Sequence, residues 1–136
     1  MLLLIQYTAR TCPECKFLIK EHPEYSLDQS QKEIFGNLSN VEFVTNVLVA
    51  DVFRRTLISV SMFSSTLMES IVNLSIPFVF DQSTLATYYP AVDNWGVEVH
   101  SLEEAKIELV HLIRDKEQLE FLTRNVAKIR DDFFSF

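Results

Sequence analysis

Three consecutive hydroxyl residues, Ser64, Ser65 and Thr66, stand between an apolar run and a second apolar segment with helical spacing. The run from Leu57 to Phe63 is partly β-branched, which is typical of a strand buried on both faces of a parallel sheet. Hydroxyl side chains at such a position cap the following helix, and the backbone N–H groups at a helix start attract anions, especially phosphate. The cluster therefore predicts either a helix cap or a phosphate-binding turn.

A second polar group follows another predicted strand. The segment from Lys16 to Lys20 has strand-like composition, and Glu21, His22 and Pro23 come directly after it. Because proline cannot donate to a strand ladder, the strand is expected to end there. Ligands of parallel sheets bind beyond the carboxyl ends of the strands. His22 and the hydroxyl cluster therefore share one predicted edge, and a binding site at this edge is the strongest functional inference from the pattern.

Cys12 and Cys15 have the C-x-x-C spacing of dithiol oxidoreductases. That chemistry requires the first cysteine at a helix N-terminus, where the thiolate is stabilised, but a strand-like run follows here. A structural zinc site requires four ligands, and His100 and His111 have no ligand spacing to this pair. Two small residues around a turn are the favoured interpretation. Dithiol chemistry is the weakest alternative, and no metal site is predicted.

Helical and strand-like patterns alternate along the chain, which predicts a Rossmann-like α/β domain with a mostly parallel sheet flanked by helices. Ser101 and Glu104 match a capping box that opens a helix, and Asp115 begins the last helix. Leu2 to Tyr7 is read as a short helix, because a parallel crossover from there to the next strand would be too short; an antiparallel hairpin remains open. The predicted strands cover residues 16–20, 41–44, 57–63, 76–80 and 97–99, and the later helices 27–35, 49–55, 67–74, 101–114 and 115–133.

Length and composition indicate one globular domain, residues 1–136. With 48% hydrophobic residues the chain can bury a core, and with 2 Gly it has no glycine-rich phosphate loop. The formal net charge of −7 argues against a nucleic-acid surface, which needs clustered Lys and Arg. No apolar run reaches the ~18–20 residues of a transmembrane segment. These observations favour a cytoplasmic protein, and none of them predicts a bound cofactor.

The order of the motifs resembles the C-terminal nucleotide-binding half of GT-B-type transferases. A strand is followed by K-x-H-P (Lys20 to Pro23), a later strand by S-S-T-x-x-E (Ser64 to Glu69), and a third strand contains I-P. The most similar groups are bacterial capsule and surface-polysaccharide glycosyltransferases, including sialyltransferases, and CDP-glycerol glycerophosphotransferases. The resemblance covers roughly residues 16–134, and the order and spacing of the motifs carry it more than either motif alone.

The resemblance implies a site for a CMP-, CDP- or UDP-linked nucleotide-sugar donor, with inverting displacement of the nucleoside phosphate. His22 would contact the donor phosphate or protonate the leaving group, and Lys20 would point toward the same cleft. The Ser64–Thr66 turn would bind the phosphate, and Glu69 would meet the ribose or the base. Trp95, in a loop near that cleft, is more readily explained as packing than as a stacking platform.

The family's N-terminal acceptor domain and the first central strand of its donor half have no counterpart here, because the segment from Leu2 to Thr11 aligns with the first helix. The resemblance therefore implies a donor-binding domain that does not catalyse alone. Truncation at the N-terminus, excision and a diverged stand-alone domain are all left open. A missing central strand would leave an open sheet edge for another chain, so a separate N-terminal domain or a homo-oligomer is the expected partner. The alternative is a non-catalytic relic or interaction module with the same fold.

Overall fold

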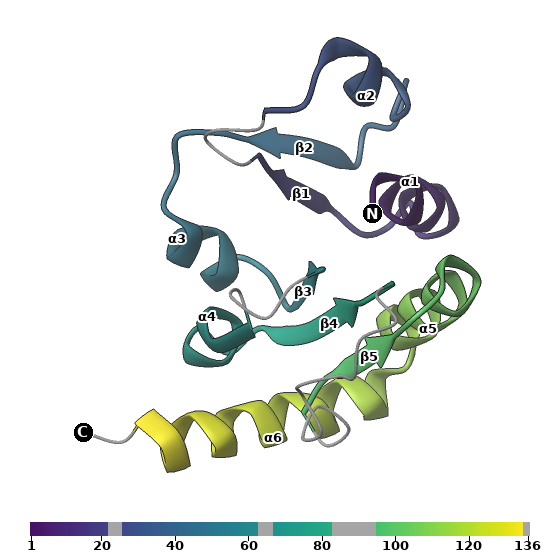
Figure 1. Ribbon diagram of the computed structural model, residues 1–136. Helices are drawn as coiled ribbons and strands as arrows, with labels where there is room; N and C mark the ends of the chain where they lie inside the picture. The colour runs from purple at the N-terminus through teal and green to yellow at the C-terminus, as the bar shows by residue number, and fades with distance from the viewer. Residues whose placement is uncertain (22–25, 63–66, 83–94, 135–136) are drawn as a thin grey trace.

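The computed structural model describes residues 1–21, 26–62, 67–82 and 95–134 (Figure 1). Every strand pair within these ranges is parallel, and helices flank the strands. The predicted α/β class is confirmed: the chain is a small mixed α/β domain, consistent with a Rossmann-like fold. Its elements are α1 (Leu2–Thr11), β1 (Phe17–Lys20), α2 (Gln29–Glu33), β2 (Val41–Val44), α3 (Val49–Arg54), β3 (Ile58–Ser61), α4 (Leu67–Val72), β4 (Ile76–Phe80), β5 (Val97–Val99), α5 (Leu102–Arg114) and α6 (Lys116–Phe134).

The strands form two sheets, where the sequence analysis expected one. β1 pairs with β2, and the second sheet has the strand order β3-β4-β5. In the view of Figure 1 the strands follow from top to bottom as β2, β1, β3, β4 and β5. Strands β1 and β3 therefore border the boundary between the sheets, and no ladder joins them in the described ranges.

The N-terminal segment is a helix, as favoured from the sequence. Helix α1 packs against α5 and buries Leu4 and Ala9. Its carboxyl end is tied to α5 by a hydrogen bond from Arg114 Nη2 to the Thr11 backbone oxygen at 2.7 Å. An arginine donor at this end satisfies one of the carbonyl groups that a helix leaves unpaired.

Asn40 connects the end of α1 to the start of β2. Its Nδ2 donates to the backbone oxygens of Ala9 at 3.0 Å, Cys12 at 3.3 Å and Cys15 at 3.0 Å. Its own backbone oxygen accepts from the N–H of Phe17 at 2.7 Å. One half-buried side chain thus holds the helix, the following turn and strand β1 against the start of β2.

Strand β4 is the centre of the main core. All five of its residues are buried, which matches the continuous apolar run expected of a central parallel strand. The residues of β1 are half-buried by contrast. The core around β4 is completed by buried residues of several helices and of β5, together with one tryptophan: Leu4, Ile71, Trp95, Val99, Ala105, Leu109, Leu112, Leu122 and Val126.

Pro77 lies inside this central strand, where proline is normally excluded. The N–H of Ile76 donates to the Leu57 oxygen at 2.7 Å, so the backbone groups of Ile76 face β3. Because these groups alternate in direction along a strand, those of Pro77 face the side of β5. Pairing with β5 begins only at Phe78, opposite Val97. The missing N–H of Pro77 therefore faces a position before β5 begins, and the ladder loses no bond.

The helix starts differ from the sequence prediction in two respects. A complete capping box joins Asp28 and Gln31 at α2, where none was predicted. At α5 the Ser101 Oγ accepts from the Glu104 N–H at 3.1 Å, as the S-x-x-E pattern predicts. The Glu104 carboxylate, however, accepts from the N–H of His100 at 3.3 Å and not from Ser101. The carboxylate therefore fixes the residue before the cap.

Helix α4 ends in the paired hydrogen bonds of a Schellman motif. The N–H of Ser75 donates to the Ser70 oxygen at 2.9 Å, and the N–H of Leu74 to the Ile71 oxygen at 3.1 Å. Leu74 has a φ of 60°, a left-handed conformation that favours glycine. A leucine here stores backbone strain directly before the central strand.

Candidate functional site

Lys20 ends strand β1 at the edge where the sequence analysis placed a site. Its Nζ donates to the backbone oxygen of Glu21 at 3.1 Å. The ammonium group is therefore held at the carboxyl end of β1, turned back on the chain. His22 and Pro23, which complete the K-x-H-P motif, lie outside the described residues.

The buried carboxylate of Glu21 was given no role from the sequence. Its side chain is 5% exposed and forms an ion pair with Lys32 Nζ at 3.1 Å. The same oxygen, Oε1, accepts from the N–H of Leu27 at 3.1 Å. Glu21 directly precedes residues 22–26 and Leu27 directly follows them, so this carboxylate clamps the two ends of the segment that contains His22.

The predicted phosphate-binding turn, Ser64, Ser65 and Thr66, also lies outside the described residues. The elements on either side of it are as predicted, with β3 before the turn and α4 after it. Glu69 occupies the first turn of α4 and is exposed. A carboxylate at that position is favourable to the helix itself. In the described ranges no hydrogen bond or ion pair joins Glu69 to Lys20.

The two cysteines lack the environment that dithiol catalysis needs. Cys12 is the C-cap of α1 and donates its N–H to the Thr8 oxygen, so it lies at the negative end of the helix dipole. Burial raises the pKa of the Cys12 thiol, with an opposing effect of Arg114. Burial and the neighbouring Glu14 raise the pKa of Cys15. Both thiols are therefore poor nucleophiles at neutral pH.

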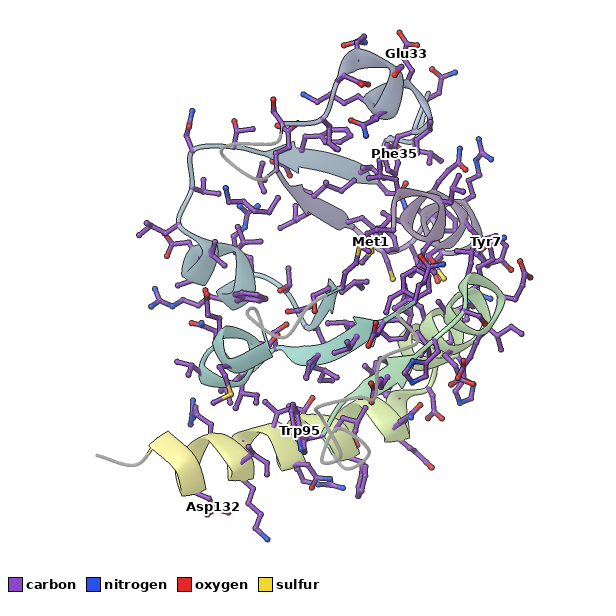
Figure 2. All side chains as sticks on the ribbon, in the orientation of Figure 1. Met1, Tyr7, Glu33, Phe35, Trp95 and Asp132 are labelled. Atoms are coloured by element: carbon purple, nitrogen blue, oxygen red, sulfur yellow. The ribbon has the colours of Figure 1, made fainter. Side chains whose placement is uncertain are left out.

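Trp95 is part of the core. Its side chain is 6% exposed and belongs to the main hydrophobic cluster, and Figure 2 shows it beside α6. This position agrees with the packing role expected from the sequence and leaves no exposed face for stacking on a base.

The structure brings together three titratable residues that sequence reasoning did not combine. Asp81 follows β4, Glu98 lies in β5, and His100 follows β5. One ligand atom from each lies within 4.8 Å of the others. The distance from His100 Nε2 to Glu98 Oε1 is 3.8 Å. The sequence signal was the E-x-H spacing at a strand end, together with an aspartate that ends the preceding strand.

Two hollows of the described surface lie elsewhere. One is lined by the end of α5 and the start of α6, including His111 and Lys116. The other lies between α6 and Leu57, the residue before β3, and includes Leu119 and Arg124. Leu57 marks the amino end of its strand, opposite the predicted site, so neither hollow coincides with the expected donor cleft.

No protein-family model matches the chain, and no match was found among curated proteins. Within the described ranges no helix combines the length and the apolar character needed to cross a membrane.

Proposed function

We propose that the chain is a nucleotide-sugar (donor) binding domain of a glycosyltransferase-like protein for surface polysaccharide synthesis. The observation that carries the proposal is the arrangement of parallel strands whose carboxyl ends lead into the two polar motifs. The K-x-H-P motif begins at the last residue of β1, and the hydroxyl cluster follows β3 and precedes α4. Ligands of open α/β folds bind at this kind of edge.

Two described residues support this placement. Lys20 provides a cation at the end of β1, which suits a diphosphate. Glu21, directly before His22 in the sequence, is fixed by the N–H of Leu27 and by Lys32, so the end of β1 from which the motif continues is held in place.

In the proposed reaction His22 contacts the donor phosphate or protonates the departing nucleoside phosphate, while Ser64, Ser65 and Thr66 hold the phosphate and Glu69 meets the ribose or the base. The acceptor hydroxyl attacks the sugar with inversion. Enzymes of the GT-B type bind the acceptor on a second domain, so we assign donor binding to this chain and not turnover by itself.

The test is a titration of the ¹⁵N-labelled chain with CMP, CDP and UDP, followed by NMR. Nucleotide should shift the amide signals of Lys20 and Glu69, and His22→Ala or Ser65→Ala should abolish the shifts. His111→Ala is the matched control, because His111 is an exposed histidine of α5 paired with Asp115. The absence of any shift at millimolar nucleotide would contradict the proposal.

A second function, an interaction module, is favoured by the edges of β1 and β3, which pair with no further strand in the described ranges. The N–H groups of Phe17 and Glu21 donate toward β2. Because backbone groups alternate in direction along a strand, the N–H and C=O of Leu18 face away from β2. In the same way the backbone groups of Ile58 and Val60 face away from β4. Parallel edges with half-buried apolar residues are templates for pairing with another chain.

This second function predicts a homo-oligomer or a complex with a strand-donating domain. Light scattering after size exclusion measures the mass of the particle. Leu18→Pro removes an outward N–H that the β1–β2 ladder does not use and should shift an oligomer toward monomer. Leu18→Ala keeps the N–H and should leave the mass unchanged. A monomer at every accessible concentration would exclude self-association through these edges.

A further inference from the structure

The cluster formed by Asp81, Glu98 and His100 lies at the carboxyl ends of two neighbouring strands. Register explains why these side chains meet. Val79 is paired with Glu98 and Phe80 with Val99, so the next residues, Asp81 and His100, also lie side by side. Glu98 and His100 are two residues apart in an extended segment and therefore share one face. Three potential ligands thus project from one corner of the sheet.

The hydrogen bond of His100 selects the ring nitrogen that faces the cluster. Its Nδ1 lies 3.0 Å from the backbone oxygen of Asp81. A carbonyl oxygen only accepts, so Nδ1 is the donor. In the neutral imidazole the lone pair is then on Nε2, which is the nitrogen 3.8 Å from Glu98 Oε1. Metal-binding histidines are typically held in this way, with the second nitrogen donating to a carbonyl or carboxylate.

The separation between Nε2 and the carboxylate also suits an intervening ion. At 3.8 Å the two atoms are too far apart for a hydrogen bond. A zinc ion lies ~2.0–2.2 Å from nitrogen and carboxylate ligands, so in a tetrahedral site two ligand atoms are about 3.3–3.6 Å apart. The His100–Glu98 pair at 3.8 Å needs to close by only a few tenths of an ångström, and the three ligand atoms, which lie within 4.8 Å of one another, must draw together to hold one ion.

We propose that Asp81, Glu98 and His100 bind a divalent first-row transition-metal ion of the zinc type. Two carboxylates balance its charge, and the imidazole nitrogen favours zinc over magnesium or calcium, which prefer oxygen alone. Three protein ligands leave a coordination position for water, as in open zinc sites. The site stands independently of nucleotide binding.

The backbone on both sides of the site is held by regular structure. His100 follows β5 and precedes the N-cap of α5, and its N–H donates to Glu104 Oε2 at 3.3 Å. Asp81 is fixed by its N–H, which donates to the Val99 oxygen at 2.9 Å. The side chain of His100 is 48% exposed, and the side chain of Glu98 is 12% exposed. An ion can therefore reach the imidazole from solvent, while the Glu98 carboxylate is largely enclosed by protein.

Isothermal titration of the full chain with Zn²⁺ tests the proposal, and Co²⁺ absorption reports the ligand geometry. We expect saturable binding of one ion per chain, weakened by at least about 10-fold in His100→Ala, because loss of a direct ligand should cost at least as much as loss of its supporting partner. Glu98→Gln should also weaken binding. His111→Ala, which removes another exposed histidine beside a carboxylate, should leave the affinity unchanged, and so should Cys15→Ser.

Two kinds of result would overturn the proposal. One is a titration in which His100→Ala binds Zn²⁺ as tightly as the unchanged chain, or in which His100→Ala and His111→Ala lose equal affinity. The other is an imidazole of His100 protonated on both nitrogens at neutral pH and unaffected by Zn²⁺ in NMR spectra, which would make the cluster an ion pair between His100 and Glu98.

Discussion

Replacement of Asn40 by alanine removes a side chain that bonds three segments of the chain at once. Its Nδ2 carries two protons and faces three carbonyl oxygens at 3.0, 3.3 and 3.0 Å, so two good hydrogen bonds are lost together with one shared contact. A hydrogen bond of this kind contributes about 0.5–1.5 kcal/mol to stability. Asn40→Ala should therefore lower the free energy of unfolding by about 1–3 kcal/mol, measured by urea denaturation followed by circular dichroism.

Asn40→Asp gives a sharper form of the same test. The carboxylate would face three carbonyl oxygens as an acceptor without a donor, so the loss at neutral pH should exceed that of Asn40→Ala. Because this environment disfavours the charged form, the aspartate's pKa would be higher in the folded chain than in the unfolded chain. Stability of this variant should therefore recover as the pH falls through that pKa, since the neutral acid can donate one bond.

The matched control is Asn73→Ala. Asn73 Nδ2 also donates to a backbone oxygen, that of Glu69 at 2.8 Å, but this bond is exposed and joins residues four apart at the end of α4. Its loss should change stability by no more than about 0.5 kcal/mol. Equal effects of Asn40→Ala and Asn73→Ala would refute the reasoning, because the long-range role assigned to Asn40 would then contribute nothing.

Two further predictions follow from the described residues. Leu74→Gly should be more stable than Leu74→Ala by about 1 kcal/mol in the same denaturation experiment. Both variants lose the leucine side chain, and only glycine adopts the left-handed backbone without strain. The opposite order would show that this φ is not strained. Burial raises the pKa of Cys12 and Cys15. The rate of iodoacetamide alkylation should therefore reach its pH midpoint at a higher pH in the folded chain than in the chain unfolded in urea. A lower midpoint in the folded chain would contradict the raised pKa.

The local pattern of the chain predicts its helices and strands well, because periodicity and caps are local properties. The run from Leu57 to Phe63 was predicted to be a strand buried on both faces, but Ser59 is the one buried residue of β3, and Leu57 and Met62 are exposed. The strand that is buried throughout is β4. Leu122 and Val126 of α6 belong to the core. Ser101 caps α5 as predicted. The helix α1 was predicted correctly, because the connection from Leu2–Tyr7 to the next strand is too short for the two to pair as parallel strands.

Contacts between distant residues were not predictable from such patterns. The division into two sheets depends on whether β1 and β3 approach to hydrogen-bonding distance, which no local property of either strand sets. The convergence of Asp81 with His100 depends on the register of β4 and β5. Asn40 acquires its partners only when α1 turns toward β2. The predicted donor-site residues His22, Ser64, Ser65 and Thr66 lie outside the described residues and stay predictions.

The separation of the two ladders determines how the molecule opens. Because the described strands β1 and β3 share no backbone hydrogen bond, the β1–β2 pair can lose its order without breaking a ladder bond of β4. The pair depends on a small core of its own, in which Phe35 meets Phe43 edge to face at 5.5 Å, and on the attachment of α1. We expect the half-buried strands β1 and β2 to exchange their amide hydrogens through partial opening, and the fully buried β4 to exchange only on global unfolding. The amide hydrogens of β1 and β2 should therefore exchange faster than those of β4, because the β1–β2 pair can open locally.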